Sequence, residues 1–348
     1  MGKEKNISSS SISKVLSQRK HFPSVSELVA GILNGDQSLL ARGITLVEST
    51  QTAHQEKAYE IIEKCLSKSR DTLRIGITGV PGVGKSTFIE RFGTLLTEMG
   101  KKVAVLAVDP SSTISKGSIL GDKTRMPQLV KDPQAFIRPS PSGDSLGGVA
   151  RKTRESIILC EAAGYDIILV ETVGVGQSET AVHSMVDFFL LLKLTGAGDE
   201  LQGIKRGIME MADAIVINKA EGDNIKRAER ARVEFERALH LYPPKENNWS
   251  PKVLTCSSFT GTGIPEIWEM IRDYQTTNKA SGYFSEKRKS QNTYWFNQTV
   301  ERLLKQQFYN REAVVKMMKP IQKEVENNAI SPFRAAERLL DLYAKGLK

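Results

Sequence analysis

Eight residues starting at Gly79 carry the most specific chemistry in this chain. They follow the pattern Gly-x-x-x-x-Gly-Lys-Ser, directly after an apolar run and before a helix-like stretch. Glycines in such a loop let backbone N–H groups turn toward a polyphosphate, and the N-terminus of the following helix adds partial positive charge. The pattern predicts a nucleotide-binding loop rather than a glycine-rich turn that only connects two elements. Its predicted binding residues are Gly79, Val80, Pro81, Gly82, Val83, Gly84, Lys85, Ser86 and Thr87.

Phosphate and magnesium chemistry assigns roles to four side chains. Lys85 is expected to reach the β- and γ-phosphate oxygens, and Ser86 is expected to ligate Mg²⁺. Asp109 and Glu171 each close an apolar run, where an acid beside a phosphate loop can hold Mg²⁺ directly or through water. Asp109 fits equally well as a turn residue before a proline. Glu171 closes so apolar a run that its carboxylate needs a partner to offset desolvation.

Three further residues lie in segments with the character of nucleotide switches. Asp122, in the polar stretch "GSILGDKTRM", is a candidate magnesium ligand through water or a nucleotide sensor, and a solvated acid fits as well. Gly174 is similar to a glycine whose N–H senses a γ-phosphate. Gln177 is a candidate for orienting the attacking water, and a polar switch residue is an equal alternative.

A second loop has the composition of a base-reading site. Asn218, Lys219 and Glu221 follow the apolar run "AIVI". A carboxylate can accept hydrogen bonds from both guanine donors, N1–H and N2–H₂, which adenine does not present in this pattern. Glu221 carries one methylene more than the aspartate usual in such loops, so its reach requires a slightly displaced backbone. Ser257 and Ser258 end a later apolar run, where a second base-contacting loop is expected.

The elements that must position these loops are short apolar runs separated by helical lengths. Runs bounded by Gly, Pro, Asp and Ser are typical of parallel strands buried on both faces. They predict an α/β fold, a P-loop NTPase with a mostly parallel, doubly wound sheet. The expected strands are residues 73–78, 103–108, 135–138, 167–171, 188–194, 214–218 and 252–257.

Helical patterns flank this region on both sides. Ser24-x-x-Glu27 is a capping box in front of apolar residues at helical spacing. The tail carries a similar stripe from Phe296 to Phe308 and another from Ala336 to Tyr343, which must pack on the main domain or on a second copy. The expected organisation is a disordered tail (1–22), a helical segment (23–70), a P-loop GTPase domain (71–278) and a helical dimerisation segment (279–348) that begins with a polar, basic connector (280–293).

Composition narrows the class of protein. The net charge of +9 is concentrated in part in residues 1–22, which hold five Lys or Arg side chains against one Glu. Apolar runs are too short to span a bilayer, and no secretory signal is evident. The three cysteines are distant from one another and form no CxxC pair, which favours small buried residues over disulfides or metal ligands. We expect a cytoplasmic protein that binds neither nucleic acid nor membrane.

Eight stretches give the chain a strong resemblance to the methylmalonyl-CoA mutase-associated GTPases (the MeaB, ArgK and MMAA type). The resemblance covers about residue 23 to the end. It rests on "GVPGVGKSTFIE", "VLAVDPSST", "SILGDKTRM", "RPSPSGDSLGGVARKTRE", "AGYDIILVETVGVGQSE", "TGAGDELQGIKRGIMEMAD", "NKAEGDN" and "TGTGI".

This resemblance implies an Mg²⁺-dependent GTPase that converts GTP to GDP and forms homodimers through its C-terminal helices. It also implies a chaperone that gates adenosylcobalamin loading of methylmalonyl-CoA mutase, or a related acyl-CoA mutase, and protects that enzyme. By motif, the metal-side residues are Ser86, Asp109, Asp122 and Glu171, and the catalytic group is Lys85, Asp122, Glu171 and Gln177. Asp199 and Lys205 fall in the family's third switch, which would couple the nucleotide state to the partner.

Three other classes of protein remain as alternatives. An ATP-dependent kinase linked to basic amino-acid transport is the meaning of an older family label, and a preference for ATP would support it. A nickel-insertion GTPase needs clustered Cys or His ligands, which the sequence does not bring together. A nucleic-acid-binding protein would use the net positive charge, but no stretch interleaves aromatic and basic residues in the way a base-stacking surface requires.

Overall fold

One parallel sheet organises the chain. The computed structural model describes residues 22–68, 71–108, 126–139, 146–172, 178–195 and 206–345. Its strands lie in the order β3-β2-β4-β1-β5-β6-β7, and each neighbouring pair is parallel. They are β1 (Leu73–Gly79), β2 (Val103–Val108), β3 (Ala135–Arg138), β4 (Ile167–Thr172), β5 (Phe188–Lys193), β6 (Ala214–Ile217) and β7 (Lys252–Thr255). All seven predicted strands are confirmed to within two residues.

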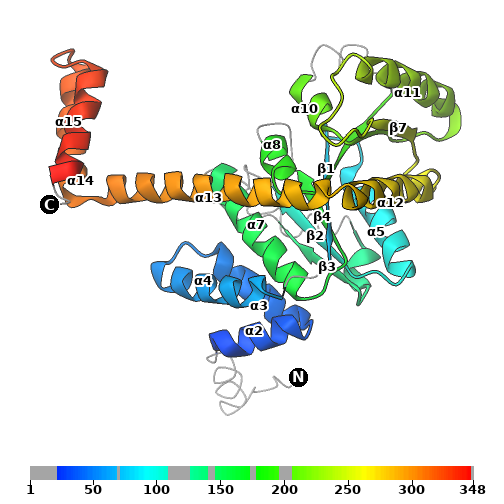
Figure 1. Ribbon diagram of the computed structural model, residues 1–348, viewed down its shortest axis with the longest axis horizontal. Helices are drawn as coiled ribbons and strands as arrows, with labels where there is room; N and C mark the ends of the chain where they lie inside the picture. Colours follow the sequence, from blue (N-terminus) through cyan, green and yellow to red (C-terminus); the bar gives the residue numbers. More distant parts are fainter. Residues whose placement is uncertain are drawn as a thin grey trace, which may run out of the picture. The chain divides into compact units, whose positions relative to one another are not determined.

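Helices cover both faces of the sheet, which confirms the doubly wound α/β class (Figure 1). One face carries α5 (Lys85–Glu98) and α12 (Ile264–Ala280), whose Phe88, Phe92 and Trp268 pack on alternate strand residues in one buried cluster. The other face carries α7 (Leu146–Ala162), α8 (Ser178–His183), α10 (Arg206–Met211) and α11 (Ile225–Leu239). Two short 3-10 helices, η1 (Leu129–Lys131) and η2 (Gly222–Asn224), lie in the connections. Burial of both faces explains why the strands read as continuous apolar runs.

A buried ion pair fixes β1, the strand that leads into the phosphate loop. Arg74 donates from Nε and Nη2 to the two carboxylate oxygens of Glu161 on α7, at 2.7 and 2.9 Å. The backbone N–H of Arg74 donates to Asp187 at 2.8 Å. Such a two-pronged pair satisfies both charges and specifies one orientation of β1 against α7.

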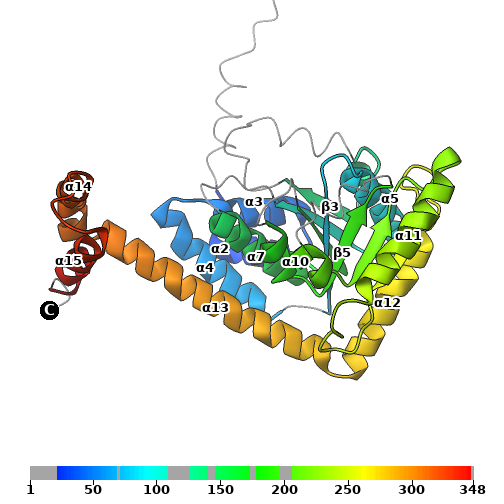
Figure 2. The same ribbon diagram turned by 90° about the horizontal axis from the view of Figure 1, so that it is seen from above.

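The N-terminal helices α2 (Val25–Leu33), α3 (Gln37–Glu48) and α4 (Thr52–Leu66) pack against α7 (Figure 2). The predicted capping box is present, because Ser24 Oγ accepts from the N–H of Glu27 while the Glu27 carboxylate accepts from the N–H of Ser24. The disordered tail predicted for residues 1–22 lies, apart from Phe22, outside the described residues.

The C-terminal helices form a second compact unit, which begins at Ser285. It contains α13 (Tyr283–Asn310) from its third residue on, α14 (Glu312–Glu326) and α15 (Pro332–Lys345). Its buried cluster consists of Val314, Ile321, Ala335 and Leu339. The prediction of a polar connector over 280–293 is wrong, because α13 runs through most of it. This stretch contains no proline, and its single glycine, Gly282, precedes the helix. A polar segment can be helical when its charged side chains pair one turn apart, as Glu286 and Lys289 do at 2.7 Å. No described helix is long and apolar enough to cross a membrane.

Candidate functional site

The phosphate loop connects the end of β1 to the start of α5, as predicted. Gly79 has a φ of 156°, and a Cβ there would lie 2.6 Å from the carbonyl oxygen of Leu192 on β5. Gly84 has a φ of 94°, and a Cβ there would lie 2.9 Å from Asn218 Nδ2. Both positions therefore require glycine for the backbone angle and for the space. The motif glycines place the N-terminus of α5 at the carboxyl edge of the sheet, where an anion can bind.

Lys85 is the first residue of α5, and its side chain is buried beneath the loop backbone. Its Nζ donates to the carbonyl oxygen of Gly79 at 2.8 Å and to that of Val80 at 3.4 Å. These bonds hold the ammonium group beside the backbone that would surround a polyphosphate. The positive charge is thus in position before the ligand arrives, which lowers the reorganisation that binding requires.

Ser86 and Glu171 meet across the phosphate loop. The Ser86 hydroxyl donates to Glu171 Oε1 at 3.3 Å, and Glu171 is 4% exposed on β4, the strand beside β1. One residue further, the hydroxyls of Thr172 and Thr78 share a hydrogen bond of 2.9 Å that fixes the strand ends. A hydroxyl and a carboxylate oxygen at a phosphate site are donors that suit Mg²⁺. The structure therefore brings together two of the predicted metal-side residues.

Six predicted residues lie outside the described residues. They are Asp109, Asp122, Gly174, Gln177, Asp199 and Lys205. Val108, the last residue of β2, is in register with Thr172, the residue after Glu171. No group of three or more His, Cys, Asp or Glu side chains suited to a metal ion occurs in the described part of the chain.

The predicted base-reading loop is joined to the phosphate loop by its own side chains. Asn218, 1% exposed, donates from Nδ2 to the carbonyl oxygen of Val83 at 2.9 Å. Its Oδ1 accepts from the N–H and the hydroxyl of Ser258, at 3.1 and 2.8 Å. Lys219 Nζ donates to the carbonyl oxygen of Gly82 at 2.9 Å. Asn218 thus connects three segments that are far apart in the sequence.

Glu221 supplies a buried acceptor at the same place. The N–H of Ala220 donates to the carbonyl oxygen of Cys256 at 2.9 Å, so the two predicted base loops touch. Glu221 Oε2 is buried and has no hydrogen-bond partner among the described residues. A buried acceptor without a donor is costly, so a ligand that brings N–H donors would be favoured here.

Cys256 lies between these loops and is a neutral thiol. Burial is the main cause that raises its pKa to about 12; a hydrogen bond with Ser258 lowers the pKa, and the nearby Glu221 charge raises it. Cys65 and Cys160 are also free and buried, so the prediction that the cysteines are buried and unpaired is confirmed.

Sequence reasoning missed two residues of α5 that hold neighbouring loops. Glu90 accepts from the N–H groups of Gln128 and Leu129, at 2.7 and 3.3 Å. Arg91 Nη2 donates to the carbonyl oxygen of Phe259 at 2.9 Å. Their partners are 38 and 168 residues away in the chain, so no local pattern could have indicated these contacts.

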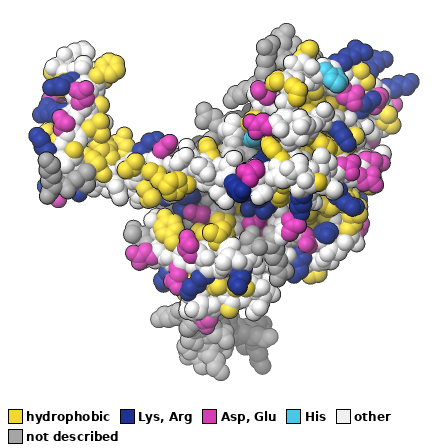
Figure 3. Space-filling model, in the orientation of Figure 1, with side chains coloured by type: hydrophobic (Ala, Val, Ile, Leu, Met, Phe, Trp, Pro, Cys, Tyr) yellow, Lys and Arg dark blue, Asp and Glu magenta, His cyan; other side chains and the backbone are white. Residues whose placement is uncertain are grey.

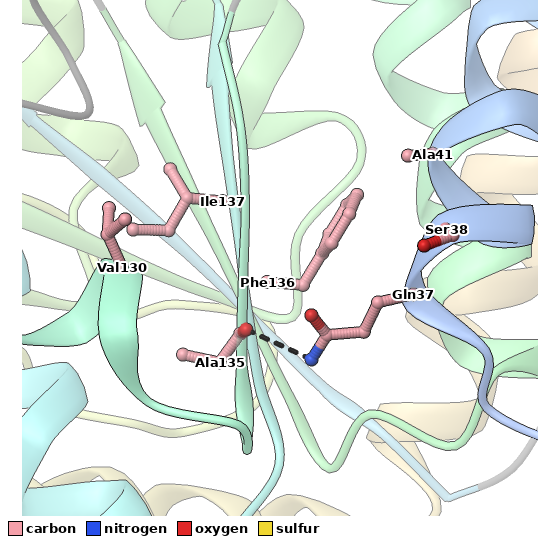
Figure 4. Close-up of a pocket in the computed structure, with 7 residues that line it drawn as sticks. All are labelled: Gln37, Ser38, Ala41, Val130, Ala135, Phe136 and Ile137. Atoms are coloured by element: carbon pink, nitrogen blue, oxygen red, sulfur yellow. Dashed lines mark hydrogen bonds between the residues drawn. The ribbon is translucent and has the colours of Figure 1, made fainter. Parts of the chain in front are cut away.

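A separate hollow of about 250 Å³ lies between α3 and the sheet edge at β3 (Figure 4). Gln37 Nε2 donates to the carbonyl oxygens of Pro133 and Ala135, at 2.9 and 3.2 Å. This contact covers part of the exposed edge of β3, a structural role. None of the predicted nucleotide residues lines the hollow.

Comparison with known proteins agrees with this geometry. A family model described as "Methylmalonyl Co-A mutase-associated GTPase MeaB" matches residues 40–313. GTPase ArgK of Escherichia coli (strain K12) is 48% identical over 309 residues, which cover 88% of this chain and 93% of that protein. The Mus musculus protein "Methylmalonic aciduria type A homolog, mitochondrial" is 46% identical over 329 residues, which cover 92% and 79%.

A solved structure shares the fold over nearly its whole length. The crystal structure of a LAO/AO transport system kinase superposes with a TM-score of 0.72 at 40% identity, covering 91% of this chain and 96% of that one. The family match spans the phosphate loop, the strand acids and the base-reading loop described above. This protein is therefore a GTPase and belongs to the methylmalonyl-CoA mutase-associated MeaB family.

Proposed function

We propose that this GTPase gates the delivery of adenosylcobalamin to methylmalonyl-CoA mutase, or to a related acyl-CoA mutase, and protects that enzyme from inactivation. The proposal draws its partner from the family description and from the name of the mouse relative. The observation that carries its nucleotide chemistry is the Asn218 junction, which joins the phosphate loop to the base-reading loop. In that loop Glu221 Oε2 is buried, and no hydrogen-bond partner for it occurs in the described part of the chain. A ligand with phosphates at one end and paired N–H donors at the other fits both the phosphate loop and the base-reading loop.

Each residue of the site has a role in this proposal. Lys85 neutralises charge on the β- and γ-phosphates, and Ser86 and Glu171 hold Mg²⁺ with Asp109 and Asp122. Bound Mg²⁺ would supply charge neutralisation at the phosphates. Gly174 senses the γ-phosphate, and Gln177 orients the attacking water. Asn218, Lys219, Glu221, Ser257 and Ser258 read guanine.

Coupling to the mutase is assigned to Asp199 and Lys205. The Lys205→Ala variant should keep basal GTP turnover and lose most of the acceleration that the mutase gives, because the residue acts on the partner rather than on the phosphates. Acceleration equal to that of the unchanged protein would remove Lys205 from the coupling.

We also propose that two copies associate through the segment 279–348. Helix α13 carries the exposed side chains Phe296, Val300, Leu303 and Leu304, whose spacing places them on one face, and apolar side chains gather along this part of the chain (Figure 3). An exposed apolar stripe of this kind favours burial against a second copy. Replacing Val300 and Leu304 by glutamate should lower the mass measured by light scattering from dimer to monomer, and an unchanged dimer would place the interface elsewhere.

The alternative is an ATP-dependent kinase connected with transport, which the name of the solved relative suggests. Adenine has one donor group on this edge, N6–H₂, and lacks the adjacent N1–H, so it could not give the Glu221 carboxylate the paired hydrogen bonds that guanine offers. A preference for ATP would therefore contradict the assignment of this loop.

One experiment tests the proposal and the alternative together. Phosphate release from GTP and from ATP is measured with Mg²⁺, with EDTA, and with and without purified methylmalonyl-CoA mutase. We expect Mg²⁺-dependent turnover of GTP that rises with the mutase, and loss of turnover in the Lys85→Ala variant. Turnover of ATP at the same rate as GTP, unchanged by addition of the mutase, would overturn the chaperone proposal.

A further inference from the structure

An exposed aromatic side chain follows the base-reading loops directly. Phe259 comes after Ser258 and is 78% exposed, although it belongs to a segment that is otherwise well tied to the protein. A large apolar ring facing water in isolation is common on surfaces. Its setting, however, distinguishes Phe259 from a chance exposed residue.

The turn that carries Phe259 is held by several hydrogen bonds. The N–H of Ser257 donates to the carbonyl oxygen of Thr262, and the N–H of Gly261 donates back to that of Ser257, both at 2.9 Å. The N–H of Thr260 donates to Ser257 Oγ at 3.0 Å. The position of the Phe259 backbone is therefore fixed before any ligand binds.

The same turn is anchored to the helix that binds phosphate. Arg91 Nη2 on α5 donates to the carbonyl oxygen of Phe259 at 2.9 Å, and α5 begins with Lys85 and Ser86. On its other side, Ser258 donates twice to Asn218 Oδ1. Phe259 thus lies where the phosphate helix and the floor of the proposed base site meet.

We propose that the Phe259 ring covers one face of the guanine base and that it compensates for the longer arm of Glu221. This inference rests on the proposed function, because it takes guanine as the ligand. Glutamate extends about one C–C bond, about 1.5 Å, further than aspartate, so its carboxylate holds the base further from the loop backbone. A base held further out loses contact with the floor formed by Asn218 and Ser258. An aromatic ring on the exposed rim restores contact with one purine face.

Aromatic stacking has the chemistry this position requires. Every purine presents a π face, and the edge-reading donors and acceptors remain with Asn218 and Glu221. Phe259 would therefore contribute affinity for the base, whereas Glu221 would decide which base is accepted. Replacing a stacking ring by alanine typically weakens binding of a base by about fivefold or more.

The test measures nucleotide binding to the full chain by calorimetry. The Phe259→Ala variant should bind GDP and GTP about fivefold to tenfold more weakly, and Phe259→Tyr should restore most of the affinity. Inorganic triphosphate, which has no base, should bind both proteins equally, because the phosphate loop is unchanged. The matched control is Phe333→Ala, which removes a ring that is 84% exposed on α15. Unchanged GDP affinity in Phe259→Ala, or an equal loss for triphosphate, would overturn the proposal.

A double-mutant cycle tests the compensation. In a Glu221→Asp background the base should rest nearer the loop floor, so Phe259→Ala should weaken GDP binding less than it does beside Glu221. Strictly additive losses would overturn the pairing of the two residues. If the unchanged protein itself fails to bind guanine nucleotides, the proposed function fails first. That result is distinct from a protein that binds GDP without the help of Phe259.

Discussion

Asn218 Nδ2 donates a hydrogen bond of 2.9 Å to the carbonyl oxygen of Val83, so the residue expected to read the base also supports the loop expected to hold the phosphates. The same amide accepts from Ser258 with its oxygen, and each of these groups is buried. Ligand recognition and loop geometry are consequently coupled through one side chain.

The Asn218→Ala variant should weaken both the support of the phosphate loop and the recognition of the base. It leaves the Val83 carbonyl and the Ser258 donors without their partner, at a cost of about 1–3 kcal/mol for each buried group left unsatisfied. We expect a melting temperature several degrees lower and GDP affinity reduced at least about tenfold. Calorimetry of unfolding and of binding measures both, with Asn327→Ala, at the exposed position that directly follows α14, as the control. A normal GDP affinity would contradict the coupling of the base-reading loop to the phosphate loop.

The Lys85→Ala variant should abolish GTP hydrolysis and greatly weaken nucleotide binding. The phosphates would lose the positive charge that the Gly79 carbonyl now holds in place. The turnover rate should fall by about 10²-fold or more, as measured by phosphate release. Lys131→Ala, on an exposed position of η1, is the matched control and should behave as the unchanged protein. Retained turnover in Lys85→Ala would place the catalytic site elsewhere.

The Gly84→Ala variant should disturb the loop without changing any charge. The φ of 94° disfavours alanine, and its Cβ would lie 2.9 Å from Asn218 Nδ2, so the Asn218 to Val83 hydrogen bond should be displaced. We expect a loss of about 1–2 kcal/mol in the free energy of unfolding and weaker GDP binding. Gly147→Ala is the control, because a Cβ there meets nothing within 4 Å and no positive φ is involved. Equal stability of the two variants would contradict the strain argument.

The three thiols should be unreactive in the folded protein. Burial raises the pKa of Cys65 to about 11 and that of Cys256 to about 12, and it also raises the pKa of Cys160. A thiol-reactive dye at pH 8 should therefore label native protein slowly and label all three cysteines after unfolding in guanidinium. A cysteine that reacts equally fast in both states would contradict its burial.

The same thiols make the free energy of unfolding fall at high pH. Their contribution to this free energy is fully present below the ordinary thiol pKa of 9.0, because the thiols are then protonated in both the folded and the unfolded state. As the pH rises from 9 toward 11–12, the unfolded thiols ionise while the folded ones stay neutral, so the free energy of unfolding falls. Denaturant melts across this range measure the decline, and a Cys65→Ala variant should show less of it.

The fold class, the seven strands and the residues of the two loops could be predicted from the sequence. Buried parallel strands are apolar on both faces, and a polyphosphate loop needs glycine at fixed spacing, so both leave local patterns. The helix through residues 283–293 could not be predicted in the same way, because a polar helix and a polar loop share their composition. The contacts of Glu90 and Arg91 were also hidden, since neither partner lies nearby in the chain.

The sequence by itself determined which residues are candidates for the chemistry: Lys85 and Ser86 in the phosphate loop, Glu171 at a strand end, and Asn218 and Glu221 in the loop after β6. Only the tertiary structure decided that Asn218 supports Val83, that Glu221 has a buried oxygen with no partner in the described segments, and that Phe259 is tied to α5. The physical reason is the parallel sheet. It brings the carboxyl ends of distant strands to one edge, and the hydrogen bonds formed there depend on packing rather than on neighbours in the chain.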